Sequence, residues 1–303
     1  MGGPPGRAHR HGAQPQLSAG ILGGAPPPPE SAAPGDGVEP LPATARQALR
    51  AELGRAFAAP YETPIVVAVN GLLMAAAWFW LPVGLQDWLF TLHGPLAFPV
   101  VLATWMFADV PATNVLGDDA RRVGTALGDP AQLRRLVYAK NAVLWLLAAP
   151  VCALIALGIG IVHRHWAAAA VTVVGILTIP LGSLGVAAWF GIRFPYHPLP
   201  LATRWRHRRP WRRMVVRWLT VVTVPYGLVP LVTTVLAGPA LLLWYRTSGH
   251  WQHRIPDGSL AVGVAVTVVV AAAAFVGGHR VGLRLIEGRR VQLADYLAHP
   301  ERG

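Results

Sequence analysis

Charged residues are scarce in this chain of 303 residues, where they make up only 13%, against about a quarter in a soluble domain. Hydrophobic residues reach 53%, and the mean hydropathy is +0.43. The apolar residues are gathered into long uncharged runs, which are typical of helices that cross a bilayer. The scarcity of charge therefore predicts an all-α integral membrane protein.

Cysteine and lysine each occur only once. Cys152 lies inside an apolar run, which excludes a disulfide framework and a metal site built from cysteines. A P-loop requires G-x-x-x-x-G-K-[ST], but Tyr138 and Ala139 precede the single lysine, Lys140. Any ATP-driven work must therefore come from another polypeptide. The other 25 of the 26 basic residues are arginine, and with so much Ala, Gly and Pro this bias indicates a GC-rich bacterial genome.

Groups that could perform chemistry are missing as well. The predicted spans contain no Asp, Glu, Lys or Arg, which argues against a carrier coupled to protons or sodium. No Ser/His/Asp arrangement is present, and Asp118-Asp119 lacks the further aspartates of a metal-dependent phosphotransferase. Four histidines lie near the outer ends of the spans: His163, His165, His250 and His253. They are not accompanied by a carboxylate or cysteine cluster that would complete a metal site, so we assign them no metal. We predict no enzyme activity, no cofactor and no nucleic-acid partner.

The chain divides into four regions. Residues 1–43 are rich in Pro and Gly and have almost no large apolar side chains, so we expect a disordered tail. Residues 44–60 have the pattern of an amphipathic helix at the membrane surface, although a solvated stub before the first span fits nearly as well. Residues 61–290 hold the spans, and residues 291–303 form a cytosolic tail.

Six runs are long enough to cross the ~30 Å hydrocarbon core. They lie near Ile65–Val83, Phe90–Ala108, Ala142–Val162, Ala167–Phe190, Trp218–Trp244 and Ser259–Gly278. Alternate connecting segments hold 23 and three of the basic residues. Because basic residues collect on the cytosolic side, both termini are expected in the cytosol of a multi-pass protein of the bacterial plasma membrane. Gly278-x-x-x-Gly282 permits close contact between helices.

The longest polar interruption, from Asp109 to Asn141, reads as two short helices. The first begins at Asn114 or Asp118 and ends at Gly128. Asp129 followed by Pro130 is a strong N-cap and first-position pair for the second. Leu133, Leu136, Val137 and Lys140 continue at helical spacing, so the second helix is amphipathic and should run directly into the third span. We call residues 118–140 the elbow. An ordinary ordered loop is an equally simple interpretation.

The segment resembles one in permease subunits of type-2 ABC exporters. The resemblance is carried by N-x-x-G-D-x-x-R, then a leucine, a proline, a leucine-rich turn and A-K-N. In this chain these residues are Asn114, Gly117, Asp118, Arg121, Leu127, Pro130, Leu133, Leu136, Ala139, Lys140 and Asn141. The plan of six spans extends the resemblance from about Arg46 to Arg290, but only the elbow matches by motif.

The resemblance implies a half-transporter. It would pair with a second permease subunit, identical or not, and with two separate P-loop ATPase subunits, and substrate would cross between the two permeases. The elbow would be a cytosolic coupling helix resting on the ATPase. The residues expected to dock there are Asn114, Asp118, Asp119, Arg121, Arg122, Pro130, Arg134 and Lys140.

A second basic loop, from Gly191 to Arg217, departs from the family pattern. Its arginines alternate with Trp and His and are expected to contact anionic membrane lipid, although a phosphate-bearing substrate or an ATPase surface could use the same charges. The contact residues would be Arg204, Arg206, Arg208, Arg209, Arg212 and Arg213. The alternative function is a non-transporting accessory or scaffold protein of the membrane, which the uncharged spans fit equally well.

Overall fold

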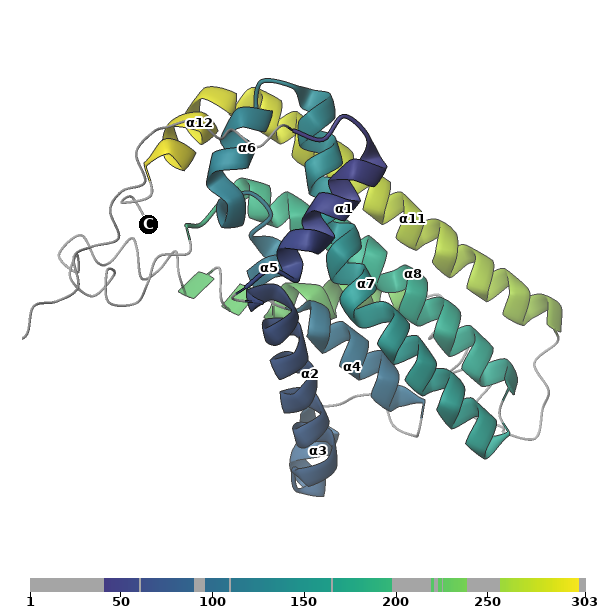
Figure 1. Cartoon of the computed structure of the whole chain (residues 1–303). Helices are drawn as coiled ribbons and strands as arrows, with labels where there is room; N and C mark the ends of the chain where they lie inside the picture. Colours follow the sequence, from purple (N-terminus) through teal and green to yellow (C-terminus); the bar gives the residue numbers. More distant parts are fainter. Residues whose placement is uncertain are drawn as a thin grey trace, which may run out of the picture. The chain divides into compact units, whose positions relative to one another are not determined.

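Helices form all the regular secondary structure in the part of the chain that the computed structural model describes. That part comprises residues 41–59, 61–89, 96–108, 110–164, 166–197, 219–220, 223–224, 226–238 and 257–299. Four of the helices are long and apolar enough to cross a membrane (Figure 1). They are α2 (Glu62–Trp80), α7 (Pro130–His163), α8 (Trp166–Arg193) and α11 (Asp257–Gly288). The all-α prediction is confirmed. The predicted disordered tail lies outside the described residues, apart from positions 41–43.

Two of the six predicted spans are represented by shorter apolar helices. Helix α4 (Ala97–Phe107) has 11 residues, a length of about 16 Å at the rise of an α-helix. The helix Tyr226–Gly238 is also shorter than a span. Both predicted spans extend into positions outside the described residues, at 90–95 and 239–244. The structure therefore establishes four helices of membrane length, and the total of six stays a prediction.

The first span ends at Trp80 and not at the predicted Val83. Leu81 is extended, with a ψ of 145°, because the residue before a proline avoids the helical region and Pro82 comes next. A separate short helix, α3 (Val83–Leu89), follows. A proline signal was therefore the better guide to this boundary than the length of the apolar run.

Helix α7, the longest of the described helices, joins the elbow to the third predicted span without interruption. The carboxylate of Asp129 accepts hydrogen bonds from the backbone N–H groups of Ala131 (2.8 Å) and Gln132 (3.3 Å). Pro130 occupies the first position, where its missing N–H has no partner to lose. The helix then runs for 34 residues, or about 50 Å. The predicted cap and the predicted continuity are both confirmed.

Helices α8 and α11 approach each other closely through glycines. A Cβ atom placed on Gly278 would overlap the backbone carbonyl of Gly185, and one placed on Gly185 would lie 2.6 Å from the Cα of Phe275. Small residues allow such backbone contact between helices in membranes, where apolar burial alone gives little drive for association. The Gly278-x-x-x-Gly282 pattern, which permits such contact, lies where α11 approaches α8 closely.

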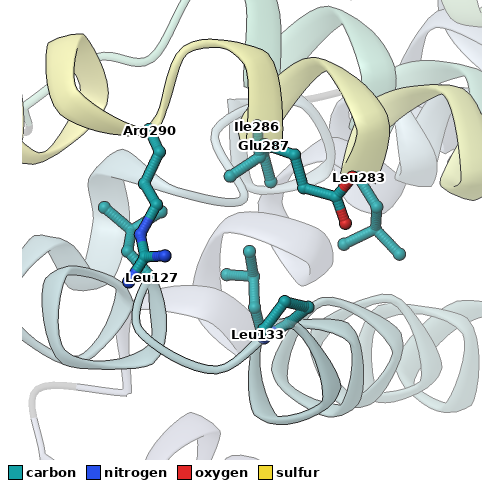
Figure 2. Close-up of a pocket in the computed structure, with 7 residues that line it drawn as sticks. Leu127, Leu133, Leu283, Ile286, Glu287 and Arg290 are labelled. Carbon is teal, nitrogen blue, oxygen red and sulfur yellow. The ribbon is translucent and has the colours of Figure 1, made fainter.

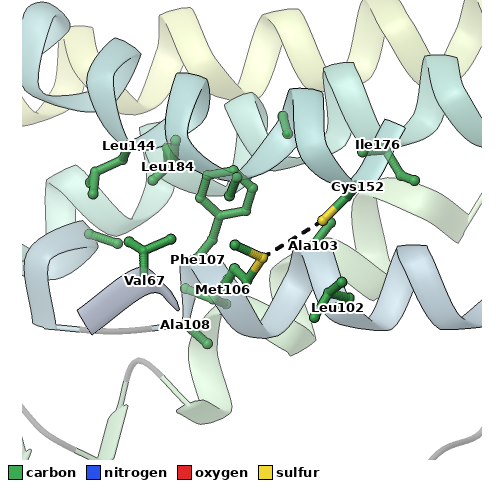
Figure 3. Packing of buried hydrophobic residues seen from close by; sticks show 14 of the residues in the cluster. Val67, Leu102, Ala103, Met106, Phe107, Ala108, Leu144, Cys152, Ile176 and Leu184 are labelled. Atoms are coloured by element: carbon green, nitrogen blue, oxygen red, sulfur yellow. Dashed lines mark hydrogen bonds between the residues drawn. The ribbon is translucent and has the colours of Figure 1, made fainter. Parts of the chain in front are cut away.

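An apolar core lies between α4, α7 and α8, with α2 at its edge (Figure 3). It includes Cys152 and Met106, whose sulfur atoms are 3.8 Å apart. Phe107 and Leu184 pack beside them and are 3% and 1% exposed. The single cysteine therefore serves as a small apolar side chain within this core.

The outer faces of the long helices are apolar and exposed. Leu72 on α2, Leu154 on α7 and Val269 on α11 are 70%, 68% and 66% exposed, as expected for faces that a bilayer covers. The hydroxyls of Thr104, Thr172, Thr178 and Ser183 bond to carbonyls four residues earlier in the same helix. These four hydroxyls are thus satisfied within their own helices. These features indicate a membrane-embedded protein.

Short helices gather where α7 begins (Figure 1). Helix α1 packs on the first turns of α7, and a capping box starts it: Thr44 and Gln47 exchange hydrogen bonds of 3.1 and 3.2 Å. The bounds are α1 (Ala45–Ala56), α5 (Val110–Thr113), the 3₁₀ turn η1 (Gly117–Asp119), α6 (Ala120–Ala126) and α12 (Arg290–Ala298). The sequence predicted no structure for α12, which packs against α6.

Candidate docking site

The elbow is an ordered turn of two helices. Helix α6 follows the 3₁₀ turn η1, with Asp119 as its N-cap residue, and ends at Ala126. Leu127 and Gly128 complete the turn that delivers the chain to Asp129 and α7. The predicted pair of helices with a break at Gly128 is confirmed. The first helix begins slightly later than predicted, because η1 takes up the residues from Gly117 to Asp119.

The underside of the elbow is apolar and fully covered. Leu133, Leu136 and Val137 are 3%, 1% and 1% exposed, and Val123 is completely buried. They belong to one cluster with residues from the ends of α8, α11 and α12: Ile192, Ile286, Leu293 and Leu297. The predicted amphipathic character of the second helix is confirmed, and its apolar side packs against the ends of the other helices. Burial on this scale holds the elbow in one position relative to the long helices.

The opposite surface of the elbow is polar and open. Arg121, Pro130 and Arg134 are exposed, as is Thr125 between them. Arg121 and Arg134 form no ion pair with another described residue. The predicted docking residues that the structure leaves accessible to a partner are therefore Arg121, Pro130 and Arg134.

Asp119 and Arg122 face inward, where they join a ring of four charges with α1. Arg122 Nη1 lies 2.6 Å from Glu52 Oε1 and 2.9 Å from Asp119 Oδ2. Arg55 Nη1 lies 2.8 Å from the same Asp119 oxygen and 3.2 Å from Glu52 Oε1. The side chains of Glu52 and Arg122 are 9% and 10% exposed. The ring holds α1 to the elbow, and Arg122 has little surface left for a partner.

Asn114 connects the segment before the elbow to the end of α8. Its side chain is 3% exposed, and Oδ1 accepts a hydrogen bond of 3.2 Å from the backbone N–H of Tyr196. Gly117 lies against the same segment, because a Cβ there would overlap the carbonyl of Tyr196. The asparagine and glycine of the motif therefore have a structural explanation in close backbone approach.

Lys140 and Asn141 lie on α7, one turn beyond the buried Leu136 and Val137. The ammonium group of Lys140 is buried and has no hydrogen-bond partner among the described residues. Asn141 Nδ2 lies 2.8 Å from His279 Nε2, and His279 Nδ1 lies 2.7 Å from the carbonyl of Phe275. Because a carbonyl only accepts, Nδ1 carries the proton and Nε2 accepts from the amide of Asn141. Nothing in the sequence connected Asn141 with His279.

Several predicted residues lie outside the described part of the chain. They include the side chain of Asp118, every arginine of the predicted lipid contact from Arg204 to Arg213, and the histidines His165, His250 and His253. Among the described residues, no group of three or more His, Cys, Asp or Glu side chains is arranged to hold a metal ion.

Sequence reasoning missed Glu52 and the helix α12 as parts of this site. For Glu52, the available signal was a single acid among the arginines of residues 44–60. For α12, the leucine pair Leu293 and Leu297 at i, i+4 spacing was the signal. No family model, no curated protein and no solved structure matches this chain.

Proposed function

We propose that this chain is the membrane-spanning permease subunit of a bacterial ATP-driven exporter. It would pair with a second permease, identical or not, and be energised by a separate P-loop ATPase that docks on the elbow. The observation that carries the proposal is the continuity of the elbow with α7. Asp129 and Pro130 begin, within the elbow, a helix of 34 residues that is long enough to cross a bilayer.

This continuity supports a mechanical role. A partner that displaces the elbow also displaces α7, because no break separates the docking turn from the span. The buried cluster under the elbow and the charge ring to α1 make these parts move together. The movement then reaches α8 and α11, which contact α7 and each other. An export cycle driven from outside the membrane needs this kind of rigid connection.

The orientation follows from the charges. The elbow lies on the side that carries 23 of the 26 basic residues, and that side is cytosolic by the positive-inside rule. An ATPase works in the cytosol, so the orientation and the docking role agree. The same rule places both termini in the cytosol of a bacterial plasma membrane.

Sidedness can be tested with single cysteines in a Cys152→Ser background. We expect a cysteine at His163, the exposed last residue of α7, to react with a membrane-impermeant maleimide added to intact cells. A cysteine at the exposed Thr125 of the elbow should react only after the cells are opened. The two positions are separated by the whole of α7, so the reverse pattern would invert the topology and remove the elbow from the cytosol.

Docking can be tested by neutralising the two open arginines of the elbow. We expect Arg121→Gln with Arg134→Gln to lower recovery of the ATPase about ten-fold when the tagged protein is purified in mild detergent, because interfacial charges guide and specify association. Thermal stability should not change, since exposed charges contribute only ~0–1 kcal/mol.

The matched control is Arg280→Gln with Arg284→Gln on α11, where both arginines are exposed. It removes as many basic residues from the predicted cytosolic side, and changes the net charge by as much, as the elbow variant does. Normal ATPase recovery is expected from it. Equal loss from both double variants would point to a general charge effect. Absence of any P-loop protein from the wild-type preparation would contradict the proposal and favour the accessory or scaffold function.

A further inference from the structure

A notch of about 110 Å³ opens between the turn of the elbow and the junction of α11 with α12. Figure 2 shows the elbow and α7 on one side and the α11–α12 junction on the other. The lining residues are Leu127, Pro130, Leu133, Leu283, Ile286, Glu287 and Arg290. Leu127, Leu133 and Ile286 are 5%, 3% and 2% exposed, so they form a fixed apolar floor.

The size of the notch limits what it can hold. Sites for small-molecule ligands typically enclose about 300–1,000 Å³, several times this volume. A single aliphatic side chain, presented by another protein, is a closer match. Pockets that receive one anchoring side chain are typical of the central contacts of protein interfaces.

The α11–α12 side of the notch carries two opposite charges, one on each helix. Glu287 and Arg290 are both exposed, and neither forms an ion pair with a described residue. In Figure 2 the Glu287 carboxylate lies beside Leu283, whereas the Arg290 guanidinium extends toward Leu127. Arg290 also approaches the elbow turn, with Nη2 3.7 Å from the place of a Cβ on Gly128. An apolar floor between a negative and a positive charge favours a partner whose own charges follow the opposite order.

The notch is continuous with the open surface of the elbow, since Pro130 belongs to both. We infer, on the basis of the proposed function, that this notch receives a segment of the ATPase. The segment presents one leucine-sized apolar side chain between a basic residue that meets Glu287 and an acidic residue that meets Arg290. The first residue of α12, Arg290, is then part of the docking surface, whereas the rest of the helix lies outside the notch.

Photo-cross-linking tests this contact in the full-length protein. Single cysteines replace Glu287 or Arg290 in the Cys152→Ser background and carry a maleimide benzophenone in membranes of the native host. We expect each to give a cross-linked peptide pair with a protein that contains a P-loop. A cysteine at Ala294, exposed on α12 but outside the notch, should give at least five-fold less. A cysteine at Thr125 reports docking on the elbow itself.

The outcomes separate the two proposals. If Thr125 cross-links to the ATPase and both notch positions do not, the notch is empty in the complex and the inference is wrong, while the proposed function stands. Cross-links from the notch only to this chain's own segments, or to a second copy, also overturn the inference. If no position captures a P-loop protein, both proposals fail.

A charge exchange gives an independent measurement. Glu287→Arg with Arg290→Glu keeps the net charge and the number of arginines, but it reverses the order of charges across the notch. We expect about ten-fold lower ATPase recovery. The control exchange, Arg284→Asp with Asp295→Arg, alters two other exposed charges on α11 and α12 and should leave recovery unchanged. Equal recovery from both exchanged variants would overturn the charge complementarity.

Discussion

Replacing Gly278 with alanine is expected to lower the stability of the protein by about 3 kcal/mol or more, since overpacking against backbone is among the more costly substitutions. The added Cβ would overlap the carbonyl of Gly185, so α8 and α11 would have to separate. A backbone atom cannot rotate away as a side chain does. Because α11 packs more extensively on α8 than on any other described helix, the loss should spread to the whole bundle. Thermal unfolding in detergent, followed by size-exclusion chromatography, measures the effect.

The neighbouring Gly277 provides a matched control. A Cβ at this position meets no atom within 4 Å. The same change to alanine should therefore raise stability slightly, because alanine favours a helix over glycine by ~1 kcal/mol. Opposite signs at adjacent glycines are the result to look for. Shifts in the same direction at both positions would show that the close approach of α8 and α11 is not what Gly278 provides.

Replacing Arg122 with methionine is expected to destabilise the protein by about 3 kcal/mol, since removing one member of a buried ion pair leaves the other charge uncompensated. Glu52 is the charge left behind, 9% exposed and 2.6 Å from the lost guanidinium. Arg55 remains near Glu52 and limits the loss. The melting temperature should fall, and proteolysis should detach α1 from the elbow before the spans unfold.

Two further variants make this prediction specific. Arg121→Met changes the exposed neighbour and should alter stability by less than about 0.5 kcal/mol. The double variant Glu52→Met with Arg122→Met should be less destabilised than the sum of the two single changes, because the buried pair is removed as a unit. Strict additivity would mean that the contact between Arg122 and Glu52 contributes nothing to the attachment of α1.

Local chemistry could be predicted from the sequence with good accuracy. Asp129 followed by Pro130 indicated where α7 begins, since a carboxylate cap and a proline act within one turn. The spacing of Leu133, Leu136 and Val137 indicated the buried side of α7. Uncharged apolar runs indicated the long helices. All these signals depend on residues that are close together in the chain.

Features formed by distant residues were not predicted. Glu52 and Arg122 meet from separate helices, and neither residue carries a local sign of the other. The packing of Leu293 and Leu297 under the elbow likewise depends on the contact of α11 with α8, which sets where α12 begins. Which distant segments pack together depends on the fold as a whole, and the periodicity of one segment gives no information about its partner.

The position of α12 sets the order in which the protein can mature. The apolar underside of the elbow, including Val123 and Leu127, is covered by Leu293 and Leu297 from the far end of the described chain. During synthesis the elbow therefore emerges long before its cover, and its leucines stay open to chaperones or to misassembly. The elbow can therefore reach its covered form only after α12 has been translated.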